Sequence, residues 1–185
     1  MFTIEYAVNS ILYQRGIYSP ETFRSVPKYD LSILITQNPE LIAYLKEIST
    51  HISQLMMKKS LKEIDVIFRR VDNKETIEKW TFQIECTDKK LKDDEEVEVD
   101  MKSVRGNIRE IMRQITASVS FLPLIENDVS FEILLHVKKE TELKEVLWKD
   151  SNNHLMTKSE KVEFRNFSTN IHGVKTQVCY KVNED

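Results

Sequence analysis

The N-terminal segment repeats its apolar residues at intervals of three and four positions, which is the period of an amphipathic helix. One face of such a helix carries Ile4, Ala7, Val8, Ile11 and Leu12. Gly16 follows directly, and glycine is the usual residue at the left-handed position that ends a helix. The pattern predicts a helix over residues 4–15.

Two longer segments have the same period. The first begins at Asn38-Pro39-Glu40, a suitable N-cap and first turn, and is predicted to end near Lys58. Its apolar face carries Leu41, Leu45, Ile48, Ile52 and Leu55. The second spans residues 103–122, where Pro123 stops it. Its apolar face carries Val104, Ile108, Ile111, Ile115, Val119 and Leu122.

Elsewhere the period changes to two, which is typical of strands. Residues 64–68 and 80–86 alternate in this way, and the turn-like Asp72-Asn73-Lys74 between them predicts an antiparallel hairpin. A further strand is predicted over residues 131–137. Residues 31–35 form only a short apolar piece, after a connection marked by Pro20 and Pro27.

The C-terminal segment, residues 138–185, is unusual. It contains a highly charged stretch, the isolated Trp148, and strand-like runs at 162–167 and 174–182 with a predicted turn at His172-Gly173. Residues 88–100 carry seven acidic and three basic residues, which predicts a solvated loop. The order helix, helix, strands, helix, strands predicts an α+β fold in which a mixed or antiparallel sheet packs on helices.

Composition narrows the possible functions. The chain has 185 residues, the length of one domain, and its 27 Lys and Arg against 30 Asp and Glu give a net charge of -3. The positive excess that general nucleic-acid binding needs is missing. The longest apolar run has five residues, far below the roughly 20 of a membrane span. The chain is therefore expected to bind neither nucleic acid nor membrane.

No sequence motif of an enzyme is present. The three glycines stand alone, which excludes glycine-rich nucleotide-binding loops, and the four histidines form no metal-binding spacing. Cys86 and Cys179 are far apart in the sequence, so we expect neither a structural zinc site nor a disulfide. We therefore expect the protein in a reducing compartment. The sequence predicts no catalytic residue, metal or cofactor. A small hydrolase or metal enzyme stays an alternative without a motif, which a stoichiometric bound metal would revive.

Three arginines, Arg105, Arg109 and Arg113, fall at i, i+4 and i+8 on the surface of the third predicted helix. They are either the solvated face of an amphipathic helix or a docking surface. The second interpretation is supported by Gln114 and Phe121, which border the arginines, and by the enrichment of arginine at interfaces.

Three stretches resemble the HORMA-domain proteins of the spindle assembly checkpoint, the mitotic arrest deficient two family. They are NSILYQRGIY at residues 9–18, RQITA at 113–117 with FLP at 121–123, and FSTNIH at 167–172 with Tyr180-Lys181. Between them KYDL at 28–31, WTF at 80–82 and IEC at 84–86 keep the same order and spacing. The resemblance covers nearly the whole chain.

The resemblance implies a HORMA fold, with three long helices packed on a largely antiparallel sheet. It implies a single domain over residues 1–185, divided into a core at 1–137 and a mobile C-terminal safety-belt hairpin at 138–185. It also implies no active site. Family members bind a short peptide by adding it as a strand to a sheet edge, and the belt then wraps across it.

The function so implied is that of a spindle assembly checkpoint adaptor that delays anaphase. Its expected partners are the kinetochore-anchored mitotic arrest deficient one protein and the activator of the anaphase-promoting complex, in nucleus and cytoplasm and at kinetochores in mitosis. The expected peptide edge and belt comprise Phe131, Ile133, Leu135, Val137, Trp148, Phe167, His172, Val178 and Tyr180.

Family members also switch between open and closed forms and dimerise through the third long helix. Arg113 and Gln114 match the motif residues at the centre of that dimer surface, and Phe121 matches the aromatic residue at its end. Arg109 is assigned to the same surface. The chain is thus expected to bind a second copy of itself.

Two departures from the family pattern affect these expectations. Relatives carry a further N-terminal segment, which in the open form occupies the sheet edge that the tail takes in the closed form, so we expect a bias toward the closed form. Gly173 stands where relatives usually carry a basic residue. A HORMA adaptor of a translesion polymerase or the meiotic axis is the alternative, against which Gln14-Arg15-Gly16 and Arg113-Gln114 argue.

Overall fold

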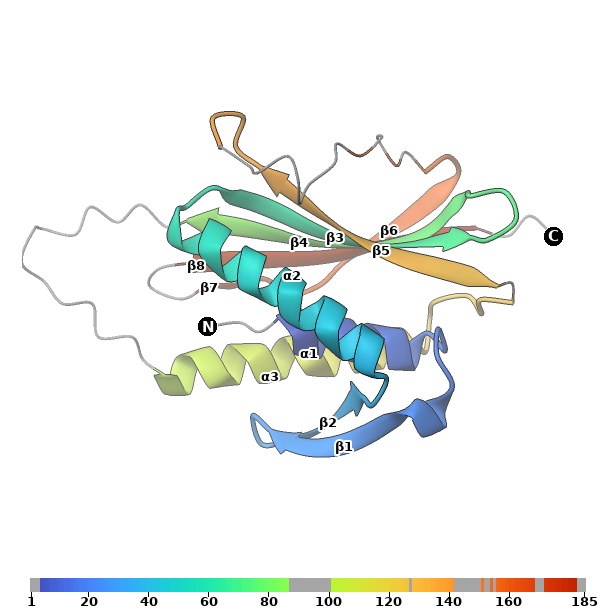
Figure 1. Cartoon of the computed structure of the whole chain (residues 1–185), viewed down its shortest axis with the longest axis horizontal. Coiled ribbons are helices and arrows are strands. Elements are labelled where there is room, and N and C mark those ends of the chain that lie inside the picture. Colours follow the sequence, from blue (N-terminus) through green and yellow to red (C-terminus); the bar gives the residue numbers. More distant parts are fainter. Residues whose placement is uncertain are drawn as a thin grey trace, which may run out of the picture.

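A computed structural model of the chain describes residues 4–86, 101–126, 128–141, 151, 154, 156–168 and 172–182. Three helices lie on one face of a six-stranded sheet, and a separate two-stranded sheet packs beside them (Figure 1). All strand pairs among the described residues are antiparallel. The predicted α+β fold is therefore confirmed. The predicted acidic loop at 88–100 lies outside the described residues.

The first two helices form as their sequence signals predict. Helix α1 spans Ile4–Gln14, and Gly16 follows it with a φ of 64°, in the left-handed region. Helix α2 spans Pro39–Met57, and the Asn38 side chain accepts hydrogen bonds from the backbone N–H groups of Glu40 and Leu41. The C-terminal end of α1 and the N-terminal end of α2 are thus capped by residues next to them in the sequence.

Helix α3 spans Met101–Ser118 and ends earlier than predicted. The Ser118 hydroxyl donates to the carbonyl of Ile115 at 2.6 Å, and the chain continues in turns to the buried Leu122. Pro123 is therefore not the residue that stops the helix. No helix in the described part of the chain is long and apolar enough to cross a membrane.

The two-stranded sheet consists of β1 (Phe23–Lys28) and β2 (Leu31–Thr36). Strand β1 was not predicted, because its residues are mostly exposed and Pro27 lies within it. A proline is tolerated here because a strand of a two-stranded sheet has one unpaired edge, where a missing N–H breaks no ladder.

The six-stranded sheet begins with the predicted hairpin of β3 (Leu61–Arg70) and β4 (Thr76–Cys86). Strand β5 (Val129–Val137) pairs with the free side of β3, and β8 (His172–Lys181) pairs with the free side of β4. Strands β6 (Ser159–Glu163) and β7 (Phe167–Ser168) both pair with the outer side of β8. The order is therefore β5-β3-β4-β8-β6, with β7 beside β8.

Two predictions for the C-terminal segment are wrong. His172 and Gly173 belong to β8 and pair with the end of β4, instead of forming a turn. The predicted single strand at 162–167 is divided into β6 and β7. Glu163 pairs with Gln177 and Phe167 with Val174, so one residue more lies on the first segment than on β8, as in a β-bulge. His172 and Gly173 become part of a strand because they pair with β4, and the segment at 162–167 is divided by its pairing with β8. Neither pairing can be recognised from the local sequence.

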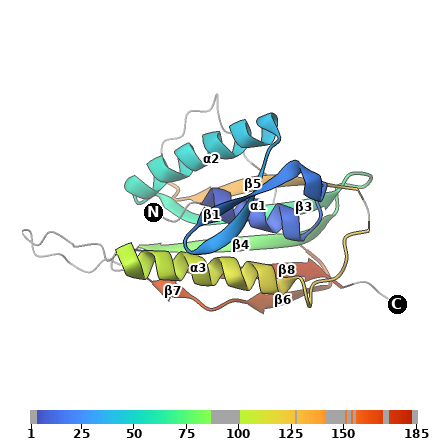
Figure 2. The ribbon, with the colours of Figure 1, turned by 90° about the horizontal axis from the view of Figure 1, so that it is seen from below.

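The core lies between the helices and the sheet. Figure 2 shows α1 between α2 and α3, across the strands. The largest fully buried side chains of the sheet, Trp80, Phe68 and Phe82, face this layer. Phe164, in the segment between β6 and β7, stacks on Trp80 with ring centroids 5.7 Å apart. The C-terminal segment therefore contributes to the main core.

Candidate functional site

Strand β5 offers an unpaired edge among the described residues, since β3 is its only strand partner there. The register of β3 and β5 continues into a hydrogen bond of 3.0 Å from the Val71 N–H to the Asp128 carbonyl. In this register the backbone N–H of Ile133 points away from β3, toward the phenol of Tyr44 on α2. Outward and inward backbone groups alternate along an antiparallel strand. Phe131, Ile133 and Leu135 therefore direct their N–H and C=O groups to the open edge.

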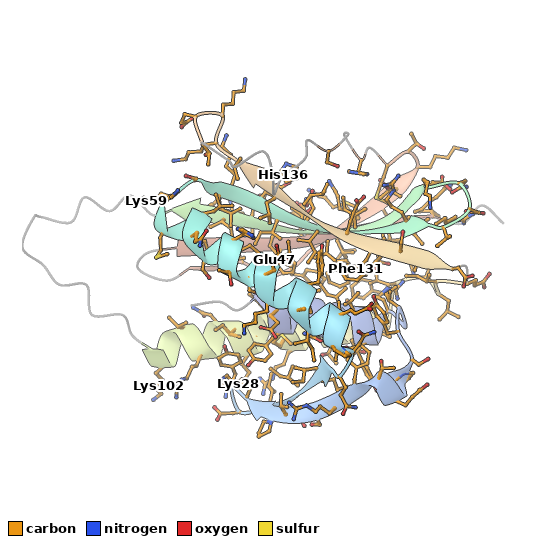
Figure 3. The ribbon with its side chains drawn as sticks, viewed as in Figure 1. Lys28, Glu47, Lys59, Lys102, Phe131 and His136 are labelled. Atoms are coloured by element: carbon orange, nitrogen blue, oxygen red, sulfur yellow. The ribbon has the colours of Figure 1, made fainter. Side chains whose placement is uncertain are left out.

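The side chains of these residues face the helices. Ile133 is buried, and the ring of Phe131 meets those of Tyr18 and Tyr44 edge to face, at centroid distances of 6.3 and 6.0 Å. In Figure 3, Phe131 lies on the helix side of the sheet and His136 on the outer side. What β5 presents at its edge is thus backbone, fixed by side chains that belong to the core.

Burial affects the phenol of Tyr44. Burial raises the pKa of Tyr44, and the Ile133 N–H opposes this only in part. The phenol is therefore neutral near pH 7 and can both accept and donate a hydrogen bond at the β5 edge. Tyr44 was not among the site residues predicted from the sequence, where it is one more residue of an amphipathic helix.

The predicted tail residues lie toward the edge of the sheet that is opposite to β5. Val178 is fully buried in β8 opposite Trp80, and the Tyr180 hydroxyl donates to Glu160 of β6 at 2.7 Å. Strands β3 and β4 separate β8 from β5. Phe167 belongs to β7 and His172 to β8. Trp148 lies outside the described residues. Within the described part of the chain, the strands that carry the predicted edge and tail residues are therefore not adjacent.

One residue between β5 and β6 reaches back to the edge strand. The ring nitrogen Nε2 of His154 lies 3.6 Å from Oε1 of Glu132 on β5 and 2.9 Å from the Ser151 hydroxyl. The His154 side chain is only 10% exposed. The connection between the two ends of the sheet thus contacts β5 directly.

Two of the predicted residues of α3, Arg109 and Arg113, lie beside the two-stranded sheet. Arg113 is exposed and lines a groove of about 390 Å³ between α1, β2 and α3. Arg109 pairs with Asp30 in the β1–β2 turn at 3.4 Å. Phe121, in the turn after α3, is 45% exposed, and Leu124 beyond it is 82% exposed. Cationic and apolar groups therefore occur together along α3 and the turn after it.

Gln114, like Arg109, is held by contacts within its own chain. Its amide oxygen accepts the backbone N–H of Arg165 at 2.7 Å, and its amide nitrogen donates to Glu110. This contact joins α3 to the segment between β6 and β7. Gln114 was predicted only as part of a docking surface, because the Arg165 contact spans 51 positions of the sequence.

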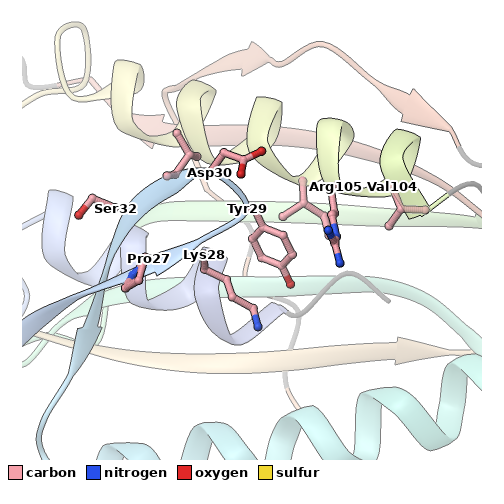
Figure 4. A pocket seen from close by; sticks show the side chains of 9 residues that line it. Pro27, Lys28, Tyr29, Asp30, Ser32, Val104 and Arg105 are labelled. Atoms are coloured by element: carbon pink, nitrogen blue, oxygen red, sulfur yellow. The ribbon is translucent and has the colours of Figure 1, made fainter.

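A second groove, of about 690 Å³, lies at the N-terminal end of α3. The β1–β2 turn forms one wall, where Tyr29 and Asp30 both have positive φ angles. Arg105 of α3 faces it from the other side (Figure 4). The arginines of α3 thus line grooves at both ends of the contact with the small sheet.

A buried ion pair connects three elements on the helix side. Nε of Arg15 donates to both carboxylate oxygens of Glu78 on β4, at 2.9 and 3.1 Å, and its Nη2 donates to the carbonyl of Pro123 at 2.6 Å. The Trp80 indole donates to the same carboxylate at 2.7 Å. Burial raises the pKa of Glu78, against the opposing effect of Arg15 and Trp80.

A second polar cluster lies on the outer face of the sheet. Asp65 of β3 accepts hydrogen bonds from the Thr81 hydroxyl at 2.6 Å and from Nε2 of His136 at 2.9 Å. Burial opposes the charge of Asp65, but His136, Thr81 and Lys79 together outweigh it and lower its pKa. The hydrogen bond with Asp65 raises the pKa of His136. A single charged residue in the apolar run of β3 is the only sequence signal of this cluster.

The comparisons with known proteins agree with this geometry. The model of the HORMA domain matches residues 2–172. The chain is 42% identical over 178 residues to the mitotic spindle assembly checkpoint protein MAD2A of Homo sapiens, covering 96% of this chain and 86% of that protein. It is 35% identical over 179 residues to the mitotic spindle checkpoint component MAD2 of Saccharomyces cerevisiae, covering 96% and 90%.

Solved structures give the same result. A chain of the crystal structure of the Mitotic Checkpoint Complex is similar with a TM-score of 0.87 and 34% identity, over 97% of this chain and 95% of that one. HTP-2 of C. elegans, in complex with the HIM-3 closure motif, has a TM-score of 0.76 over 97% and 87% of the two chains. At 18% identity, this second likeness shows the fold alone.

Three helices on one face of an antiparallel sheet, with β5 as one of its edge strands, are thus a HORMA fold, as the sequence predicts. The chain belongs to the HORMA-domain family and, within it, to the MAD2 proteins of the spindle assembly checkpoint. These relatives support a checkpoint function in mitosis. HORMA-domain checkpoint adaptors are generally non-enzymatic.

Proposed function

We propose that this chain is a non-catalytic adaptor that captures a short extended peptide at the β5 edge and delays anaphase. The observation that carries the proposal is the open edge of β5, whose outward backbone groups belong to Phe131, Ile133 and Leu135. An added strand gains its affinity from such backbone groups. The C-terminal segment, residues 138–185, would then cross over the peptide as a belt.

The position of the tail supports this proposal. Strand β8 pairs with β4, at the far side of the sheet, and so leaves β5 accessible. His154 contacts Glu132 of β5, on the path that a belt would follow. We propose that this arrangement is the closed form and that it predominates. A stable, peptide-free monomer with β8 away from β4, observed by NMR, would contradict this.

The peptide test uses the full chain and isothermal titration calorimetry. A peptide with a short aliphatic core, a flanking basic residue and a nearby proline is expected to bind tightly at one equivalent and to exchange slowly. Methylating single backbone nitrogens of the peptide sharpens the test. Methyl groups on nitrogens that face β5 should abolish binding, and those on alternate nitrogens should not. Absence of binding, or equal loss at every position, would contradict strand addition.

The proposed partners are the mitotic arrest deficient one protein and the activator of the anaphase-promoting complex, bound in nucleus and cytoplasm and at kinetochores. Motif peptides from both should compete for one site. Recovery of a translesion polymerase or meiotic-axis protein from cell extract, in place of these partners, would favour the alternative HORMA adaptor.

We further propose that the surface formed by Arg109, Arg113, Gln114 and Phe121 binds a second copy of the chain. Arg113 is exposed beside a groove, and Phe121 supplies apolar area. Arg113→Glu should shift sedimentation velocity toward the monomer without changing peptide binding. Lys46→Glu, the same charge change at an exposed position of α2, is the matched control. Equal self-association of both variants would contradict the assignment.

A further inference from the structure

Three potential metal ligands converge on the outer face of the sheet, which the helices do not cover. Glu63 and Asp65 lie two positions apart on β3 and so point to the same face, and His136 of β5 pairs with Glu63. One ligand atom from each residue lies within 4.8 Å of the others. Nε2 of His136 is 2.9 Å from Oδ2 of Asp65 and 3.7 Å from Oε1 of Glu63.

Neighbouring side chains hold both carboxylates in this orientation. The Thr81 hydroxyl bonds Oδ1 of Asp65 at 2.6 Å, and the amide of Gln83 bonds Oε2 of Glu63 at 3.1 Å. The remaining oxygen of each carboxylate is the one that faces His136. Such outer hydrogen bonds are the usual means of orienting metal ligands.

The spacing fits a zinc ion. Bonds of about 2.0–2.1 Å in a tetrahedron put ligand atoms roughly 3.3 Å apart. The two distances from His136, 2.9 and 3.7 Å, lie on either side of this value, and the carboxylate oxygens lie within 4.8 Å of each other. The Asp65 side chain is 3% exposed, whereas those of Glu63 and His136 are 24% and 49% exposed. The open side leaves room for a water as the fourth ligand.

We propose that Glu63, Asp65 and His136 together bind one Zn²⁺ ion. The ion would join the edge strand β5 to β3 across their ladder, and its role would be structural, since no chemistry is assigned to it. No metal was expected from the sequence, because His136 lies 71 positions from Asp65 and forms no motif with it. The proposal does not depend on peptide capture.

Two groups compete with the ion. Lys79 Nζ lies 3.7 Å from Oδ2 of Asp65, and a proton on His136 occupies the position of the metal. Affinity should therefore increase with pH across the range in which His136 loses its proton. Removing the Lys79 charge should strengthen binding, because the ammonium group repels the ion from the same oxygen.

The test is calorimetric titration of the full chain with ZnCl2 at pH 7.5. We expect one equivalent bound, with affinity reduced about tenfold or more in His136→Gln. His51→Gln, a histidine change on α2, is the matched control and should bind like wild type. Absence of binding, equal binding by His136→Gln, or loss of binding in His51→Gln would overturn the proposal.

Lys79→Met gives an independent measurement that does not depend on removing a ligand. Its affinity for Zn²⁺ should increase several-fold, and the imidazole NMR signals of His136 should shift at one equivalent. Unchanged or weaker binding by this variant would overturn the assignment of Asp65 as a ligand.

Discussion

The two faces of the six-stranded sheet each bury one carboxylate, and they differ in the partner that balances it. On the helix side Glu78 is paired with Arg15, whose charge does not depend on pH in the range that proteins tolerate. On the outer face Asp65 is paired with His136, which can lose its charge near neutral pH. The same sheet therefore contains one ion pair whose cation keeps its charge and one whose cation can lose it.

The largest expected effect on stability comes from breaking the ion pair of Arg15 and Glu78. Arg15→Met leaves the Glu78 carboxylate buried without a cation, which should lower the free energy of unfolding by about 3–5 kcal/mol. Urea denaturation followed by circular dichroism measures this. Adding Glu78→Gln to the same chain should recover part of the loss. If the double variant is less stable than Arg15→Met, uncompensated charge is not the cause.

Breaking the outer pair should have a smaller effect. Asp65→Asn keeps a group that can accept from Thr81 but removes the charge that His136 and Lys79 face. We expect a loss of about 2 kcal/mol at pH 6, the range of a hydrogen bond to a charged group. The same urea titration at pH 8.5 should give a smaller loss. Equal losses at both pH values would mean that the His136 charge contributes nothing.

The pH profile of stability distinguishes the two members of the outer pair. His136 has a raised pKa in the folded chain, so its contribution is complete below about pH 6.5 and is lost as pH rises through the folded value. Asp65 has a lowered pKa, so its contribution is lost only as pH falls below about 3.9 and through the folded value.

The free energies of unfolding of wild type and His136→Gln should therefore differ by less than about 1 kcal/mol at pH 5.5, because solvent screens the half-exposed imidazole. The difference should decrease toward zero at pH 8.5. Urea unfolding of both chains between pH 5.5 and pH 8.5 measures this difference. A difference that grows with pH would contradict a stabilising positive charge on His136.

The smallest effect is expected where a polar pair is exposed. Tyr180→Phe removes the hydrogen bond from the phenol to Glu160, between β8 and β6, at the sheet surface. We expect a change of no more than about 0.5 kcal/mol in the free energy of unfolding. A loss near that of Asp65→Asn would show that burial is not what separates the strong contacts from the weak.

The helices and the central hairpin could be predicted from the sequence because their signals are local. Asn38 caps α2, Gly16 ends α1, and the strands of the β3–β4 hairpin alternate. Strand β1 was missed because it is polar and contains Pro27, and the start of β8 was missed because only β4 makes it a strand. Long, periodic segments determine their own structure, whereas short ones take it from their neighbours.

The candidate site could be predicted only in part for the same reason. The candidate residues of β5 and α3 were predicted from strand alternation, the arginine stripe and the resemblance together. Tyr44 at the β5 edge, the Arg15–Glu78 pair and the cluster around Asp65 join residues that are far apart in the chain. No spacing in the sequence connects them, and the sheet register does.

The position of β8 has a consequence for rates. It is an interior strand, paired with β4 along Glu78 to Cys86 on one side and with β6 and β7 on the other. Moving it to another edge would require the ladder with β4 to open and the stacked rings of Phe164 and Trp80 to separate. Such a step is local unfolding, with a high activation barrier, in contrast to the hinge motion of a lid. Amide protons of β8 should therefore exchange with solvent as slowly as those of β3, and the tail would act as a timer.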